Sequence, residues 1–360
     1  MKRKDLTGVG IFLLASAAVF LLPRLPWVTD FRAQEFSYVG IYFIALLGLN
    51  VLTGYTGQIS LGHGAFMAIG GYTTAILISD QGLKLGNHTF SSDMRDIWTI
   101  PLAGLVAGIV GFLFGFPALR LTGLYLALAT FAIAVAMPGL IKYDRFETFT
   151  GGGGGINLFE SEGRTRPTET TDPITFETIS EPIKYLGLEI PTFNEWLYYL
   201  CWTVALVMFA LAWALLRGKT GRSFRAVRDS ELAAASSGVN LATYKTLAFG
   251  ISAFYAGVAG SLLAIATTFV NPDTYPITLS IFLLVGVVVG GLGSLWPLVF
   301  GAIFIQFLPL WAQEVSKAQG APAVVYGVIL ILVMILLPGG AAGLIRRLQT
   351  LTTRGYHRGR

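Results

Sequence analysis

The stretch RGKTGRSFRAVRDSELAAASSGVNLATYK, residues 217–245, lies between two long apolar runs and is rich in basic residues. It contains only two acids, Asp229 and Glu231. Its basic residues are Arg217, Lys219, Arg222, Arg225, Arg228 and Lys245. Because basic loops between membrane helices are retained on the cytoplasmic side, the stretch predicts a cytoplasmic helix between two membrane spans.

The residues inside this stretch have helical spacing. Arg222, Arg225 and Arg228 recur every three residues, so they share one face of a helix. We expect the helix to end at Gly238, because the residue after a helix often needs a positive φ. The alanines at 233–235 would let another protein approach the backbone closely. Two interpretations remain: a solvated basic loop that only fixes topology, or a coupling helix that docks onto a cytoplasmic partner.

The composition places most of the chain in a membrane. Hydrophobic residues make up 54% of the 360 residues, and charged residues only 12%. A soluble domain usually carries about twice that share of charge. The single cysteine, Cys201, excludes an intrachain disulfide. The sequence has no Walker-type phosphate loop, and no second ligand at metal-site spacing accompanies His63.

The apolar runs predict an all-α polytopic membrane protein with about ten spans. The runs cover residues 6–22, 36–52, 61–79, 97–118, 124–141, 196–216, 247–270, 278–311 and 322–337. The run 278–311 is too long for one span and short for two, and glycines at 290–294 divide it. Counting it as two gives an even number, which places both basic chain ends in the cytoplasm. Its halves are either broken helices beside a substrate path or short packing helices.

The charged segments predict the domain organisation. The segment 142–195 holds ten of the chain's 20 acids and a glycine run, so we expect an extracytoplasmic loop. The expected parts are an N-terminal helix with an outer link at 1–35, a first transmembrane core at 36–141, the loop at 142–195, a second core at 196–340 that includes the coupling loop 217–246, and a basic cytoplasmic tail at 341–360.

A second stretch, NVLTGYTGQISLGHGAF at 50–66, brings polar side chains into the apolar region. Polar groups at membrane depth tend to face the bundle interior or a water path. The glycines between them allow non-helical backbone, which a membrane tolerates only under protein or water. The stretch predicts either a pathway for a zwitterion or groups that cap the next helix. The candidate pathway residues are Asn50, Gln58, Ser60 and His63, together with Tyr125, Thr130, Gly290 and Gly291.

Glycine pairs with four-residue spacing predict close packing between helices. These pairs are Gly104/Gly108, Gly111/Gly115 and Gly286/Gly290.

Five blocks resemble, in order, those of a known family, the branched-chain amino-acid permease subunits of ATP-binding-cassette importers (the LivM-like family). The blocks are GYTGQISLGHGAF at 54–66, RLTGLYLALATF at 120–131, TGG at 150–152, Glu-x-Ala-Ala-x-x-x-Gly at 231–238 and GGLGSLW at 290–296. The likeness extends over about residues 36–337. Pro297 and Leu298 replace the usual Gly-Pro, and the outer segment is longer than expected, which leaves the substrate open.

The resemblance implies a permease subunit that moves branched-chain or related amino acids across the inner or plasma membrane. Its partners would be a second homologous permease, two cytoplasmic ATP-binding subunits, an extracytoplasmic solute-binding protein and the lipid bilayer, with no nucleic acid. ATP and Mg would be bound by the partner subunits, and this chain would bind no cofactor, hold no metal and carry no catalytic residue. The coupling residues would be Arg222, Arg225, Arg228, Glu231, Ala233, Ala234 and Gly238.

Other functions are open on the residues alone. A passive solute channel fits the apolar runs, and the resemblance also leaves open a urea or short-amide permease of the same family. A proton-coupled carrier would need a carboxylate inside the membrane, and no Asp or Glu lies within the runs as drawn. A membrane enzyme would need a nucleophile and a base at usable spacing, which the sequence does not offer.

Overall fold

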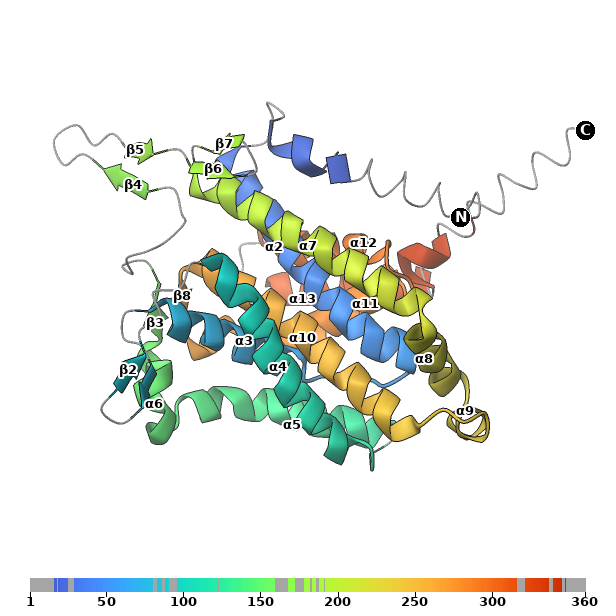
Figure 1. Cartoon of the computed structure of the whole chain (residues 1–360). Coiled ribbons are helices and arrows are strands. Elements are labelled where there is room, and N and C mark those ends of the chain that lie inside the picture. Colours follow the sequence, from blue (N-terminus) through green and yellow to red (C-terminus); the bar gives the residue numbers. More distant parts are fainter. Residues whose placement is uncertain are drawn as a thin grey trace, which may run out of the picture.

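A computed structural model describes most of the chain as a helical bundle (Figure 1). The described residues are 16–17, 19–24, 29–79, 83–85, 88–90, 96–121, 123–158, 168–171, 178–181, 183–185, 188–190, 192–315, 321–336, 339–344 and 347. The longer helices are α2 (Asp30–Asn50), α3 (His63–Ile78), α4 (Asp96–Ala118), α5 (Leu124–Ile141), α7 (Phe193–Arg217), α10 (Leu241–Thr267), α11 (Ile277–Gly290), α12 (Leu298–Val315) and α13 (Ala321–Leu336). The expected all-α class is confirmed.

Short elements join the long helices. The short helices are η1 (Leu22–Arg24), the π-helical η2 (Val51–Tyr55), α6 (Asp144–Thr150), η3 (Gly152–Gly154), α8 (Lys219–Asp229), α9 (Glu231–Ser236) and η4 (Pro272–Thr274). The strands are β1 (Leu83–Leu85), β2 (His88–Phe90), β3 (Ile156–Asn157), β4 (Thr168–Thr171), β5 (Thr178–Glu181), β6 (Ile183–Tyr185), β7 (Leu188–Ile190) and β8 (Phe269–Val270). All strand pairs are antiparallel and two-stranded, and β3 with β8 ties the 142–195 segment to the end of α10.

Within the described residues, six segments are long and apolar enough to cross a membrane: α2 with η2, α4, α5, α7, α10, and η4 with α11. Helices α3 and α12 are apolar but shorter. The expected first span at 6–22 lies largely outside the described residues, as does most of the tail at 341–360. The total of ten spans and the side of each chain end therefore stay predictions.

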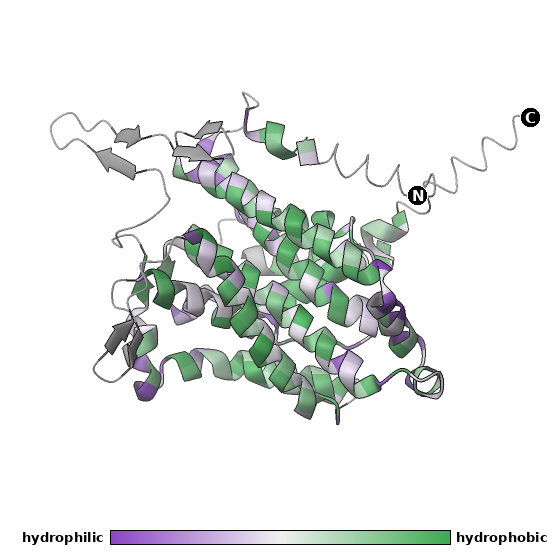
Figure 2. Ribbon diagram, viewed as in Figure 1, coloured by the Kyte–Doolittle hydropathy of each residue, from purple (hydrophilic) through white to green (hydrophobic). Residues whose placement is uncertain are grey.

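Two helices form the centre of the bundle. Of the most apolar 18 residues of each helix, 83% are buried in α2 and 89% in α10, against 33% in α4 and 28% in α5. The outer helices expose large apolar side chains, such as Leu113 and Leu128. Figure 2 shows this hydrophobic coat along α4 and α5, and the hydrophilic residues gathered at α8. Such a surface is stable in lipid and not in water.

Glycines let three helices approach one another closely. A Cβ added at Gly260 of α10 would lie 1.9 Å from the Met67 carbonyl oxygen of α3. One added at Gly111 of α4 would lie 2.2 Å from the Ala253 Cβ of α10. Helix α10 is thus held between α3 and α4 by backbone contact, as expected where small residues meet in a membrane bundle. The predicted packing role of the glycine pairs in α4 is confirmed.

The predictions for the run 278–311 and for the helix over 222–238 had different outcomes. The run 278–311 is two helices, α11 and α12, separated by residues 291–297, where Gly291 and Gly293 have φ of 110° and 73°. The single helix expected over 222–238 is wrong, because the chain leaves helix geometry at Ser230 and restarts as α9. The Ser230 hydroxyl caps the new helix by accepting from the Ala233 amide. Gly238 ends α9 with φ 81°, as predicted.

The substitution Gly260→Ala should destabilise the bundle. Its methyl group has no space against the backbone of α3, and overpacking a core costs about 1–3 kcal/mol. We expect the thermal unfolding midpoint of the purified protein in detergent to fall by several degrees. Gly139→Ala in α5 is the control, because nothing lies within 4 Å of the added Cβ. Equal midpoints for the two variants would contradict the packing described here.

Candidate functional site

The stretch 50–66 forms a break at the end of α2. Helix hydrogen bonding gives way to the π-helical turn η2, and α3 begins only at His63. Asn50 is fully buried, and its side chain spans to the break between α11 and α12. Its Nδ2 donates to the Ser294 carbonyl at 2.9 Å, and its Oδ1 accepts from the Gly293 amide at 2.9 Å. One amide side chain therefore joins the two breaks.

Gly54 lies where a third segment reaches the same place. A Cβ here would lie 2.0 Å from the Asn50 Oδ1, so the network requires glycine. The Gly54 carbonyl accepts a hydrogen bond from the Arg228 guanidinium of α8. This carbonyl is available because the Gln58 amide donates to the Leu52 carbonyl instead, at 3.1 Å. The end of α2, the α11–α12 break and α8 thus meet at one point.

Hydroxyl groups of the stretch and of neighbouring helices accept hydrogen bonds from backbone amides of the stretch. The Thr130 hydroxyl of α5 accepts from the Leu61 amide at 2.9 Å, and the Ser280 hydroxyl of α11 accepts from the Gly64 amide at 2.9 Å. The Ser60 hydroxyl accepts from the nearby Gly62 amide at 3.3 Å. Ser60 and Thr130 thus satisfy backbone amides that precede α3, whose N-cap residue Gly62 receives no side-chain cap bond. A pathway role for these residues stays a prediction.

Two buried polar atoms of the stretch have no partner among the described residues. They are the Oε1 of Gln58 and the Nε2 of His63. The other predicted pathway residues lie apart from the meeting point or pack against backbone. Tyr125 is 72% exposed on the outer face of α5. Gly290 and Gly291 let Leu298 and Ala342 approach the end of α11.

The short helices α8 and α9 carry the predicted coupling residues. Phe224 and Val227 of α8 are buried, and the Phe224 ring packs edge-on against Tyr244 of α10. Arg222 and Arg225 are exposed beside them. In α9, Ala233 is exposed and Ala234 is buried. Leu232, which sequence analysis did not single out, is 83% exposed and is the large apolar side chain that α9 presents outward.

Glu231 has an internal partner. Its carboxylate lies 2.6 Å from the Lys245 Nζ of α10, which holds α9 against the start of α10. The pair borders a small cavity of about 140 Å³ at the junction of η2, α5, α8 and α10. Gln58 and Arg228 also line this cavity. One predicted pathway residue, Gln58, therefore lies at the same junction as the predicted coupling residues Arg228 and Glu231.

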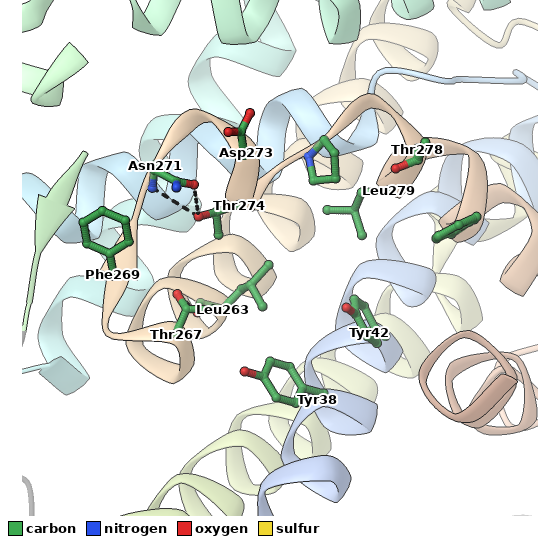
Figure 3. Close-up of a pocket in the computed structure, with 12 residues that line it drawn as sticks. Tyr38, Tyr42, Leu263, Thr267, Phe269, Asn271, Asp273, Thr274, Thr278 and Leu279 are labelled. Atoms are coloured by element: carbon green, nitrogen blue, oxygen red, sulfur yellow. Dashed lines mark hydrogen bonds between the residues drawn. The ribbon is translucent and has the colours of Figure 1, made fainter. Parts of the chain in front are cut away.

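A larger cavity of about 620 Å³ opens at the opposite end of the bundle (Figure 3). Tyr38 and Tyr42 of α2 lie on one side of it, and the turn between α10 and α11 lies on the other. Its size is within the range of small-molecule sites. It is lined by Tyr38, Tyr42, Leu263, Thr267, Phe269, Asn271, Asp273, Thr274, Pro276, Thr278, Leu279 and Phe282.

This outer cavity combines apolar walls with a few polar groups. Leu263, Leu279 and Phe282 supply apolar surface. Asn271 and Thr274 bond to each other and hold the turn, so they are engaged internally. The exposed Asp273 carboxylate has no basic side chain paired with it in the described part of the chain. Sequence analysis missed this site, although Asp273 is the one charged residue in the turn NPDTYP.

The apolar coat, the interrupted helices and the basic loop at one end of the bundle are those of a multi-pass membrane protein. The profile of the family described as "Branched-chain amino acid transport system / permease component" matches residues 33–337, and the chain belongs to this family.

Relatives with this description come from bacteria and an archaeon. The chain is 33% identical over 354 residues to the high-affinity branched-chain amino acid transport system permease protein LivM of Escherichia coli, covering 96% of this chain and 76% of the relative. It is 34% identical over 316 residues to LivM of Salmonella typhimurium, covering 85% and 68%. A probable LivM of Methanocaldococcus jannaschii is 21% identical over 346 residues, covering 86% and 93%. No significant match to a solved structure is found.

The substitution Asn50→Leu should weaken the junction between the two breaks. It leaves the Gly293 amide and the Ser294 carbonyl without their partner, and an unsatisfied buried group costs about 1–3 kcal/mol. We expect a lower thermal unfolding midpoint in detergent. Ser37→Ala is the matched control, because this buried α2 hydroxyl bonds only to Ala33 of its own helix. A midpoint no lower than that of the control would refute the bridging role.

Proposed function

We propose that the chain is a permease subunit of an ATP-driven importer and that it carries branched-chain amino acids across the plasma membrane. The observation that supports this most directly is the family match over residues 33–337, together with relatives whose names state this transport. ATP and Mg would be bound by two partner subunits, because this chain contains no Walker-type phosphate loop. A second permease and an outer solute-binding protein would complete the assembly.

The proposed orientation places α8 and α9 in the cytoplasm. The stretch 217–245 is basic, and short basic loops stay on the cytoplasmic side. The acidic segment 142–195 is tied through β3 and β8 to the opposite end of α10. The outer cavity is at that same end, so it would face the side from which substrate arrives.

The docking surface for an ATP-binding subunit would centre on Leu232. It projects from α9 with exposed Ala233 and Ala235 beside it, so a partner can approach the helix closely. Apolar side chains that fill a partner's pocket carry much of the energy of such contacts. Arg222 and Arg225 border this surface and would steer the partner through charge. Glu231 and Ala234 would support it from inside.

The outer cavity would be the first binding site for substrate in this chain. A branched-chain amino acid has an aliphatic side chain, an ammonium group and a carboxylate. The aliphatic part would lie on Leu263 and Leu279, and the ammonium group would pair with Asp273. A urea or short-amide substrate lacks the ammonium group and would gain nothing from this carboxylate. The Asp273 position therefore favours amino acids over the alternative substrates of the family.

The substitution Leu232→Asp should uncouple the permease from its ATPase. A charge on this apolar surface must be desolvated on docking, so we expect the ATP-binding subunits to be lost on co-purification and uptake to fall by about tenfold or more. Ala242→Asp is the control, because an acid in the exposed first turn of α10 is compatible with the helix dipole. Normal assembly of the Leu232→Asp protein would rule out this surface.

The substitution Asp273→Asn should weaken substrate capture. It removes the charge that would pair with the ammonium group, and we expect the half-saturating concentration for uptake in proteoliposomes to rise by about two- to fivefold, because an exposed ion pair contributes about 1 kcal/mol or less. The ATPase rate without substrate should stay unchanged. Asp144→Asn, in an exposed turn of α6 at the same end, is the control. Equal half-saturation for both variants would remove Asp273 from the substrate site.

A further inference from the structure

We propose that Arg228 is a positioning residue that ties the docking helix α8 to the break in α2, so that movement of α8 reaches the substrate path through this side chain. The inference rests on the proposed function and assigns Arg228 a different role from the other arginines of α8. Its guanidinium donates to the Gly54 carbonyl within the bundle. The bond joins residues 174 positions apart in the sequence.

The acceptor is a backbone group released by the π-helical turn. In a regular α-helix, the Gly54 carbonyl would accept from the amide four residues later, at position 58. The Gln58 amide instead donates to Leu52, so Gly54 needs another donor. π-helical turns are frequent at functional sites because they free such groups. An arginine from another segment satisfies this one.

Glycines shape the space for the Arg228 side chain. Gly57, with φ 73°, lies beside the Arg228 stem, and a Cβ there would be 3.4 Å from its Cγ. Gly293, also with φ 73°, lies beside the guanidinium, and a Cβ there would be 3.0 Å from its Nη1. The side chain is therefore bordered by the break after α2 and by the break between α11 and α12. A movement of Arg228 would therefore act on both breaks.

The neighbouring arginines do not make this connection. Arg225 donates at 3.5 Å to the Leu216 carbonyl, which is at the end of the adjoining helix α7. For Arg222, no side-chain partner is found within the described part of the chain. Arg222 has the same charge and lies on the same helix, so it is a matched control for Arg228.

The connection continues beyond Gly54. Asn50, one turn earlier, bonds to Gly293 and Ser294. A displacement of α8 by a docked partner would therefore pull on η2 through Arg228 and on residues 291–297 through Asn50. The break after α2 and the break between α11 and α12 would respond together, because Gly54 and Asn50 are in tight contact. A Cβ added at Gly54 would lie only 2.0 Å from the Asn50 Oδ1.

The test compares Arg228→Gln, Arg228→Lys and Arg222→Gln in the complete complex reconstituted in proteoliposomes. We expect Arg228→Gln to assemble with the ATP-binding subunits and to hydrolyse ATP at the basal rate. Its substrate transported per ATP hydrolysed should fall by about tenfold, within the usual range of coupling between sites. Arg228→Lys keeps a donor for the Gly54 carbonyl and should restore part of this ratio. Arg222→Gln removes one steering charge from the docking surface, so it can slow assembly, but it should leave the ratio unchanged in the assembled complex.

Three results separate the role of Arg228 from the proposed function. Loss of the ATP-binding subunits from the Arg228→Gln complex would show that Arg228 is a docking contact. It would contradict the proposed role of Arg228 as a link between α8 and Gly54. A normal transport ratio in Arg228→Gln would also overturn it, while the importer function would stand. A wild-type complex that transports without ATP would instead refute the importer function on which the inference rests.

A second variant tests the link between Arg228 and Gly54 without removing the arginine. Gly57→Ala adds a methyl group beside the Arg228 stem at an exposed backbone position. We expect it to lower the transport ratio with assembly intact, even where Arg228→Gln fails to fold. Gly153→Ala, in the short helix η3 with nothing within 4 Å of the added Cβ, is the control. An unchanged ratio in Gly57→Ala would contradict the inference.

Discussion

The structure depends on the satisfaction of backbone groups inside an apolar bundle. Lipid offers no hydrogen bonds, so a helix can stop at membrane depth only where the protein itself supplies partners. Helix bonding is interrupted at η2 and again at 291–297, and Asn50 bonds across the two interruptions. Each break thus stabilises the other.

The glycines of α10 also stabilise the bundle, through close packing of helices and not through hydrogen bonds. They bring α3 and α4 into backbone contact with α10, which leaves little volume for side chains at the centre. A densely packed centre is rigid, so relative movement concentrates where helices are interrupted. In this chain those places are η2, the α11–α12 break and the turn that borders the outer cavity. The small junction cavity and the outer cavity lie at opposite ends of this system.

The sequence predicted what depends on local pattern. The runs 97–118 and 124–141 match α4 and α5 to within one residue, because loop residues bound each run and the helices face lipid on most sides. Ser230 was missed as a helix start, because a single capping hydroxyl inside a helical pattern is a weak local signal. The bonds from Asn50 to Gly293 and from Arg228 to Gly54 could not be predicted, because they join positions separated by 243 and 174 residues. Equal spacing of Arg222, Arg225 and Arg228 shows that they share a face, and it gives no sign of which one bonds to the end of α2.

The two interpretations of residues 50–66 are compatible in this structure. Groups that hold a helix break in place also set the shape of any passage beside it, so a capping residue affects transport without touching substrate. Direct recognition would then belong to the outer cavity, where an apolar wall meets one carboxylate. Such a site binds weakly, because a single exposed ion pair contributes about 1 kcal/mol or less. Weak binding suits a permease, since substrate must leave the site as readily as it arrives.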